Sequence, residues 1–187
     1  MILPIYLYNH PILRQKAIPI RSITPEIVTL AENMFETMYQ ANGIGLAANQ
    51  VGQRHAMIVV DIRDTDEGND TPPLCLLNPR IIAYSDKQVE YEEGCLSVPG
   101  IRELVVRPDQ VTVEYDDLEL HPQRIEAEGL LARVLQHEID HLQGIYFFDR
   151  ISPLRRSFLR NKLKKLERGI AIECAYPYVH SSVNVEQ

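Results

Sequence analysis

The side chains best suited to chemistry in this sequence lie in the run His137-Glu138-Ile139-Asp140-His141, which is set among apolar residues. Four residues make slightly more than one turn of an α-helix, so on a helix His137 and His141 share a face and can bind one metal ion. Glu138 then lies beside that pair, where it can act on a metal-bound water instead of ligating the metal. The pattern predicts a metallohydrolase.

A pattern this short also arises by chance, on an amphipathic helix with two hydrogen-bonded histidines and a solvated glutamate. The residues that follow limit which kind of metal site could exist. A metzincin protease would continue with a glycine and then a third histidine, but here Gly144 is followed by Phe147 at the histidine position. A third ligand must therefore come from elsewhere in the chain.

The elements that must position these residues follow from apolar periodicity and from turn residues. A helix begins at Thr24-Pro25-Glu26 and ends at Gly43, and an acidic, turn-rich segment from Arg63 to Pro73 is expected to be an exposed loop. Strands are expected at Ala56 to Ile62, Leu74 to Tyr84, Gln88 to Cys95, Val105 to Tyr115 and Arg124 to Ala127, and further helices at Leu130 to Leu142 and Pro153 to Arg168, the last stopped by Gly169.

One helix, several antiparallel strands and two further helices indicate an α+β fold. We expect a single catalytic domain over residues 1–187, with antiparallel strands packed around the central metal-binding helix. The N-terminal and C-terminal helices are expected to complete that domain, with a basic terminal helix at about 153–168 and a tail at 170–187 that has no clear period.

Composition excludes several classes of protein. No apolar run is long enough to span a bilayer, and the N-terminus does not resemble a signal peptide, so we expect no membrane association and a cytoplasmic protein. Three cysteines, Cys75, Cys95 and Cys174, are an odd count that argues against a disulfide framework. The net charge of -7 argues against specific DNA binding, although the segment from Arg155 to Arg168 carries a local charge of +6.

Three separated segments carry a resemblance to a known family. Gly43 to Gln50, Glu93 to Ser97 and Gln136 to His141 resemble, in the correct order, the three signature motifs of peptide deformylase. A lone cysteine is most often an ordinary buried thiol, but the resemblance implies that Cys95 is the third metal ligand. The resemblance covers most of the chain, from Pro11 to the start of the last helix.

The resemblance also implies a mechanism for removing the formyl group from the formylmethionine of newly synthesised polypeptides. Cys95, His137 and His141 would hold the metal, and a water at the fourth position would attack the formyl carbon. Glu138 would act first as general base and then as general acid, releasing formate. The Gln50 side-chain amide and the Leu96 backbone N–H would stabilise the oxyanion.

A substrate site is implied in the same way. Gly43 and Gly45 permit close backbone approach, so that Ile44 and Gly45 can run beside an extended peptide. Arg102 could bind the peptide backbone or carboxylate, or be an exposed arginine, and we expect Arg133 to pack its stem while its charge reaches water. The methionine side chain is expected to lie against Ile44, Tyr91, Leu130, Val134 and the edge of His137.

The donor set of one thiolate and two imidazoles suits several metals. The resemblance implies Fe²⁺ as the physiological ion, with Zn²⁺, Ni²⁺ or Co²⁺ as substitutes. It implies formylated nascent peptides as partners, and the basic terminal helix could hold the enzyme near ribosomal RNA. The alternative is a solvated helix face whose Leu159, Leu163 and Leu166 pack on the domain.

Two other functions remain as alternatives. An HExxH-type metallo-endopeptidase would need a downstream third ligand, for which Glu167 and Glu173 are available. A structural metal site in a binding module would not depend on Glu138.

Overall fold

The main sheet is built on a strand that is buried on both faces. The computed structural model describes residues 1–66, 71–170 and 172–181. Strand β3 (Met57–Val60) is an unbroken apolar run, and every residue of it is buried. It pairs with its neighbours in an antiparallel sheet of order β2-β3-β4-β7-β8. The other strands of this sheet are β2 (Gly45–Ala47), β4 (Leu74–Tyr84), β7 (Gln110–Asp116) and β8 (Pro122–Glu128).

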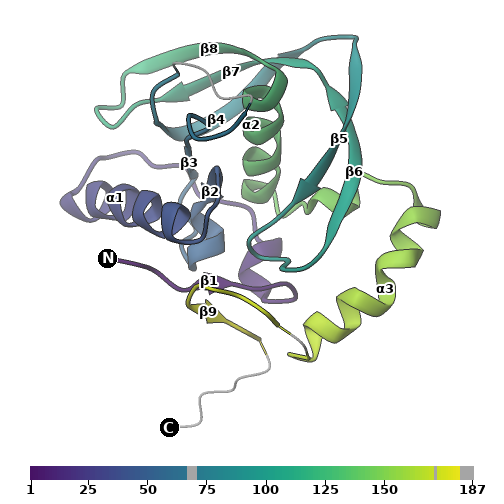
Figure 1. Cartoon of the computed structure of the whole chain (residues 1–187). Coiled ribbons are helices and arrows are strands. Elements are labelled where there is room, and N and C mark those ends of the chain that lie inside the picture. Colours follow the sequence, from purple (N-terminus) through teal and green to yellow (C-terminus); the bar gives the residue numbers. More distant parts are fainter. Residues whose placement is uncertain (67–70, 171, 182–187) are drawn as a thin grey trace, which may run out of the picture.

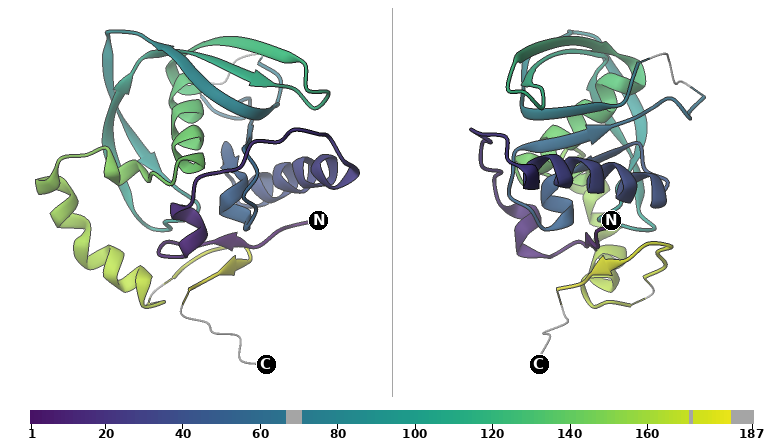
Figure 2. Two further views of the ribbon diagram at one scale, coloured as in Figure 1. Left: turned by 180° about the vertical axis from the view of Figure 1, so that it is seen from behind. Right: turned by 90° about the vertical axis from the view of Figure 1, so that its left-hand side faces the viewer.

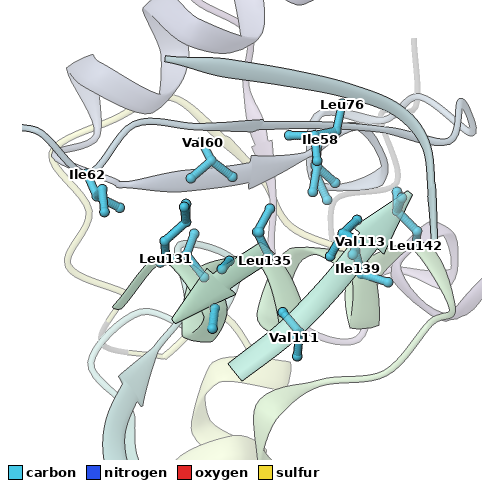
Figure 3. Packing of buried hydrophobic residues seen from close by; sticks show 14 of the residues in the cluster. Ile58, Val60, Ile62, Leu76, Val111, Val113, Leu131, Leu135, Ile139 and Leu142 are labelled. Carbon is cyan, nitrogen blue, oxygen red and sulfur yellow. The ribbon is translucent and has the colours of Figure 1, made fainter. Parts of the chain in front are cut away.

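One face of this sheet is covered by helix α2 (Gly129–Leu142), which carries both histidines and stands in the middle of the molecule (Figure 1). The helix is surrounded by protein, because every residue from Leu130 to Leu142 is buried. Figure 3 shows the apolar cluster between the helix and the sheet, in which Leu135 and Ile139 of the helix lie near Ile58 and Val113 of the strands. This packing fixes the rotation of α2 and hence the direction of its histidines.

The opposite face of β3 packs on helix α1 (Pro25–Gln40). Pro25 stands at the first helical position, where its missing N–H costs nothing. Met34 and Met38 of the helix are fully buried against Met57 and Val59 of the strand. The helix stop lies one residue before the predicted Gly43, because the left-handed residue after its C-cap is Asn42, with φ of 54°.

A separate hairpin packs on the far side of α2 from the main sheet (Figures 1 and 2). It consists of β5 (Gln88–Gly94) and β6 (Arg102–Pro108), paired antiparallel from Gln88↔Pro108 to Gly94↔Arg102. The predicted single strand from Val105 to Tyr115 is therefore wrong. Pro108 cannot donate to a ladder and Asp109 turns the chain, so β6 and β7 belong to different sheets.

The C-terminal part returns to the N-terminal part. Helix α3 (Pro153–Glu167) buries Leu159, Leu163 and Leu166, and Gly169 after it has φ of 68°, as expected for a helix stop. The chain then forms β9 (Tyr178–Val179), which pairs parallel with β1 (Ile5–Tyr6). Strands of two residues are too short to produce a sequence period, so neither was predicted.

The other predicted elements are confirmed within a few residues, including β4 at both ends. Short 3₁₀ turns complete the chain at Pro11–Arg14 (η1), Ala48–Val51 (η2) and Phe147–Asp149 (η3). In the acidic loop, residues 67–70 lie outside the described residues, as do 171 and 182–187 of the tail. In the part of the chain that the structure describes, no helix is long and apolar enough to cross a bilayer.

Candidate metal and active site

Three predicted metal ligands meet where the end of β5 faces α2. Cys95 follows directly after β5, and His137 and His141 lie one turn apart on α2. The Cys95 Sγ lies 3.2 Å from His141 Nε2, which lies 3.2 Å from His137 Nε2. All three donor atoms lie within 4.8 Å of one another, and among the described residues this is the one cluster of His, Cys, Asp and Glu close enough to hold a metal.

The geometry of this cluster fits a tetrahedral metal ion. Bonds of about 2.0 to 2.3 Å to nitrogen and sulfur place neighbouring ligand atoms about 3.3 to 3.6 Å apart. The two separations of 3.2 Å lie close to that range without a metal between the atoms. Three protein ligands leave the fourth position open, which is typical of a catalytic rather than a structural site.

The protonation of the two histidines also suits a cation. Burial and the nearby charge of His137 hold the pKa of His141 well below its ordinary value, so this ring is neutral, as ligation requires. Burial lowers the pKa of His137 too, but hydrogen bonds with Cys95 and Glu93 outweigh it and raise this pKa to about 10. The cluster therefore attracts one positive charge, which a metal ion can supply in place of the proton.

Glu93 orients the first histidine from behind. Its Oε2 atom lies 2.9 Å from His137 Nδ1, which directs the other ring nitrogen toward Cys95 and His141. Burial alone would raise the pKa of Glu93, but hydrogen bonds from His137 and Arg107 hold it below its ordinary value. Glu93 is thus a buried carboxylate that keeps its charge.

Glu138 lies at the boundary between the cluster and open space. It is only 5% exposed, it lines the adjacent cleft, and its Oε2 atom is buried without a hydrogen-bond partner among the described residues. Burial raises the pKa of its carboxyl group to about 7. A carboxylate that both takes up and gives back a proton near neutral pH needs a pKa in this range.

Gln50 and Leu96 border the same space. The Gln50 Oε1 atom accepts a hydrogen bond of 2.9 Å from the Ala47 N–H, so its amino group faces the other way. That amino group donates to Ser97 Oγ at 3.1 Å and lies 3.5 Å from Cys95 Sγ. A fixed amide donor next to the cluster is the arrangement expected of an oxyanion site.

A cleft of about 890 Å³ opens over these residues. It brings together all of the predicted site residues except His141, which lies beneath its floor. The predicted residues that line it are Ile44, Gly45, Gln50, Tyr91, Cys95, Leu96, Arg102, Leu130, Val134, His137 and Glu138. Arg102 stands exposed at the cleft, 3.5 Å from Glu92.

One sequence-based interpretation needs correction. Arg133 does not extend its charge into water: it is buried, and its guanidinium donates to Glu93 and to the Val89 and Val105 carbonyls. The glycines agree with the expected close approach, and neither Gly43 nor Gly45 has a positive φ. Close approach alone explains Gly45, where an added Cβ would lie 2.5 Å from Glu138 Oε1.

Sequence reasoning also missed residues that support or line the site. Arg107 joins Glu93 to Asp140, and no periodicity could reveal this, because the partners lie on three different elements. Tyr176 and Lys162 line the cleft from the C-terminal part of the chain. Glu173, which the sequence offered only as a ligand of the endopeptidase alternative, lines it too but is not part of the ligand cluster. Phe147 stands at the sequence position of the third metzincin histidine. Its ring stacks on that of His137, with 6.1 Å between the ring centroids.

Comparisons with known proteins agree with this geometry. A family profile described as polypeptide deformylase matches residues 2–157. The chain is 44% identical over 186 residues to the peptide deformylase of Salinibacter ruber, covering 96% of this chain and 95% of the relative. It is 46% identical over 162 residues to that of Rhizobium meliloti, covering 87% and 92%.

Solved structures give the same result. The crystal structure of a peptide deformylase from Legionella pneumophila is 42% identical, with a TM-score of 0.81 over 90% of this chain and 96% of that one. A plant peptide deformylase reaches a TM-score of 0.84 at 39% identity, over 89% and 90%. These relatives favour deformylation over the endopeptidase alternative. The chain belongs to the polypeptide deformylase family, whose members are metal-dependent hydrolases that remove the formyl group from an N-terminal methionine.

Proposed function

We propose that Cys95, His137 and His141 hold the metal ion of this deformylase and that Glu138 moves the proton. The observation that carries the proposal is the meeting of three ligand atoms beside a buried carboxylate with an unpartnered oxygen at the cleft. The ion supplies Lewis acidity when bound, lowering the pKa of a water to the order of 7 and polarising a carbonyl.

The residues of the chain then have distinct tasks. Glu138 accepts a proton from the water while the water oxygen bonds to the formyl carbon. It then returns that proton to the α-amino nitrogen as the C–N bond breaks. Formate and a free amino terminus result. The Gln50 amide and the Leu96 backbone N–H donate to the oxygen of the formyl group while negative charge develops on it.

The substrate is proposed to bind as an added strand. β2 is an edge strand that pairs with β3 on one side, and Ile44 and Gly45 line the cleft. An extended peptide can therefore use its free edge. Tyr91, Leu130 and Val134 supply an apolar wall for the methionine side chain, and Arg102 is placed to contact the peptide main chain or carboxylate.

The assignment of Glu138 is tested with Glu138→Ala. We expect the variant to keep its metal and to lose formate release from a formyl-methionyl peptide by about a thousandfold. Glu126→Ala, an exposed carboxylate on β8, is the control and should release formate like the unmodified enzyme. Unchanged turnover in Glu138→Ala would refute the proposed role and would favour a structural metal site.

We propose Fe²⁺ as the physiological ion, with Zn²⁺, Ni²⁺ or Co²⁺ as substitutes. A thiolate with two imidazoles accepts each of these metals, so ligand chemistry alone does not choose among them. Anaerobically purified enzyme should contain iron and lose formate release in air. Full activity with zinc alone and no iron in a fresh preparation would contradict this.

We further propose one catalytic domain over residues 1–187 that acts in the cytoplasm on formylated nascent peptides at the ribosome. Helix α3 supports the proposed action at the ribosome, because its basic side chains at Arg160, Lys164 and Lys165 are exposed. Exposed cations favour binding to the phosphates of RNA. Arg155 is already paired with Glu90 and Glu103, and Arg156 with Asp149, so these two contribute less free charge.

Co-sedimentation with ribosomes at low salt tests this proposal. Neutralising Arg160, Lys164 and Lys165 should abolish co-sedimentation and leave formate release unchanged. A control that neutralises the exposed Lys16 and Arg21 removes basic charge from outside α3. Equal co-sedimentation of the α3 variant and the control would overturn the ribosome proposal.

A further inference from the structure

The C-terminal segment from Ile172 to Ser181 packs against both β1 and α3, at the lower edge of the molecule as drawn (Figures 1 and 2). The Ile5 N–H donates to the Pro177 carbonyl and the Leu7 N–H to the Val179 carbonyl, each at 2.9 Å. His180 is buried, and its Nε2 atom lies 2.6 Å from the Leu166 carbonyl in the last turn of α3. The segment is therefore a built part of the fold.

This segment reaches the cleft through Tyr176. The Tyr176 hydroxyl donates to the Leu96 carbonyl at 2.6 Å, and its ring packs with Ile5 and Leu7 in a small apolar cluster. Glu173 from the same segment and Lys162 from α3 line the cleft beside it. Burial raises the pKa of Tyr176, so its hydroxyl stays protonated at neutral pH and can donate.

The hydrogen bond from Tyr176 completes a set of three on the loop that follows β5. The Cys95 carbonyl accepts from the Val98 N–H at 2.9 Å, and the Ser97 carbonyl accepts from the Tyr8 N–H at 2.7 Å. Tyr176 donates to the Leu96 carbonyl, which lies between those of Cys95 and Ser97 in the chain. The Leu96 N–H lies in the same peptide plane as the Cys95 carbonyl, and Tyr176 holds the next plane along the chain. Because both planes are held, the φ and ψ angles of Leu96 that join them are restrained, and so is the direction of its N–H.

We propose that Tyr176 is a positioning residue for formyl hydrolysis, which holds the Leu96–Ser97 peptide plane from the C-terminal segment and thereby restrains the adjoining plane that carries the Leu96 N–H. This inference rests on the proposed role of the Leu96 N–H as an oxyanion donor. Removing the hydroxyl leaves the metal ligands and the cleft walls in place but frees the Leu96–Ser97 plane, so that the plane of the Leu96 N–H is held only by the bond from Val98 to the Cys95 carbonyl. A donor that is no longer preorganised stabilises the transition state less, with little effect on binding of the ground-state substrate.

Tyr176→Phe tests the inference, with Tyr178→Phe as the matched control, because Tyr178 lies in the same segment with an exposed side chain. We expect Tyr176→Phe to lower kcat about tenfold, with KM changed by less than about twofold. Amide hydrogen exchange in residues 94–98 should become about fivefold faster, with exchange in α2 unchanged. Tyr178→Phe should match the unmodified enzyme in all three measurements.

Equal kcat in the two variants would overturn the inference, and so would faster exchange throughout the molecule, which would indicate general destabilisation. Gln50→Ala, measured in parallel, separates this failure from that of the proposed oxyanion site. If Gln50→Ala loses turnover and Tyr176→Phe does not, only the role of Tyr176 is wrong. If Gln50→Ala keeps full turnover, the oxyanion site itself is assigned wrongly.

Discussion

The carboxylate of Glu138 and the absent side chain of Gly45 depend on each other. A Cβ at position 45 would lie 2.5 Å from Glu138 Oε1 and 2.8 Å from Val134 Cγ1. Gly45 is buried within an edge strand, in a region where the backbone itself would accept any residue. Glycine is therefore required here by the space that the Glu138 carboxylate occupies.

Gly45→Ala should displace Glu138 and reduce kcat about a hundredfold, because a shift of roughly 1 Å in a reacting group has an effect of this size. Metal content should stay unchanged, since Cys95, His137 and His141 do not contact the new methyl group. Steady-state kinetics and metal analysis on the same sample check both parts. An enzyme with metal and full kcat would contradict the argument.

At the residue scale, Cys75 differs from Cys95 because it lies outside the cluster of potential metal ligands. Burial in β4 raises the pKa of its thiol to about 12, so the thiol stays protonated at neutral pH and gains reactivity only as the pH approaches that value. Iodoacetamide at pH 8 should leave Cys75 unmodified in the folded protein and modify it in denaturant. Mass spectrometry measures this, and labelling at equal rates in both conditions would disprove it.

Among the elements, the hairpin β5–β6 and helix α2 are joined by buried charge rather than by apolar contact alone. Arg107 on β6 donates to Glu93 on β5 through Nε at 2.7 Å and to Asp140 on α2 at 2.7 Å. Arg133 on α2 also donates to Glu93, and Arg150 pairs with Asp140 from outside. The network holds Cys95 and the histidines in register, because the ligands lie on the elements that it joins.

Arg107→Met should therefore lower the free energy of unfolding by about 2 to 3 kcal/mol, since two buried carboxylates each lose one charged partner. Glu93 keeps Arg133 and His137, and Asp140 keeps Arg150. Arg80→Met is the control, because the Arg80–Glu114 pair is exposed and worth about 1 kcal/mol or less. Urea denaturation of both variants, with metal in excess, gives the comparison. Equal stability of the two variants would show that the network contributes little.

For the molecule as a whole, a metal ion held by Cys95, His137 and His141 as proposed would join two bodies of structure. Cys95 lies at the end of the hairpin, whereas His137 and His141 lie on the helix packed against the main sheet. A ligand that binds only the folded state stabilises it by mass action, by about 2.7 kcal/mol at a free concentration of a hundred times Kd. The proposed site therefore predicts that metal binding adds to the stability of this fold.

Removing the metal with a chelator should lower Tm by several degrees, and adding Fe²⁺ or Zn²⁺ should restore it. The matched control is Cys95→Ser, which loses a thiolate ligand and should show a smaller shift with the same chelator. Differential scanning calorimetry under anaerobic conditions measures both. A Tm that does not respond to metal in the unmodified chain would mean that metal binding does not stabilise the packing of the β5–β6 hairpin on α2.

Local periodicity made the helices and most strands predictable. The placement of His137 and His141 one turn apart needs only the pitch of an α-helix, and the run from Met57 to Val60 is apolar enough for a strand buried on both faces. The strand break at Pro108-Asp109 was missed because the residues on both sides alternate alike. Only their different partner strands separate them.

By itself, the sequence determined which side chains are available for catalysis. Two histidines and a glutamate lie on one helical turn, and three motifs resemble those of peptide deformylase. Those features depend on residues close together in the chain or on motif spelling. The tertiary structure decided which distant groups meet them. It brought Cys95 to the histidines, buried Arg133 and Glu93 behind them, and returned Tyr176 to Leu96. Contacts between residues far apart in sequence depend on how whole elements pack, which local periodicity does not encode.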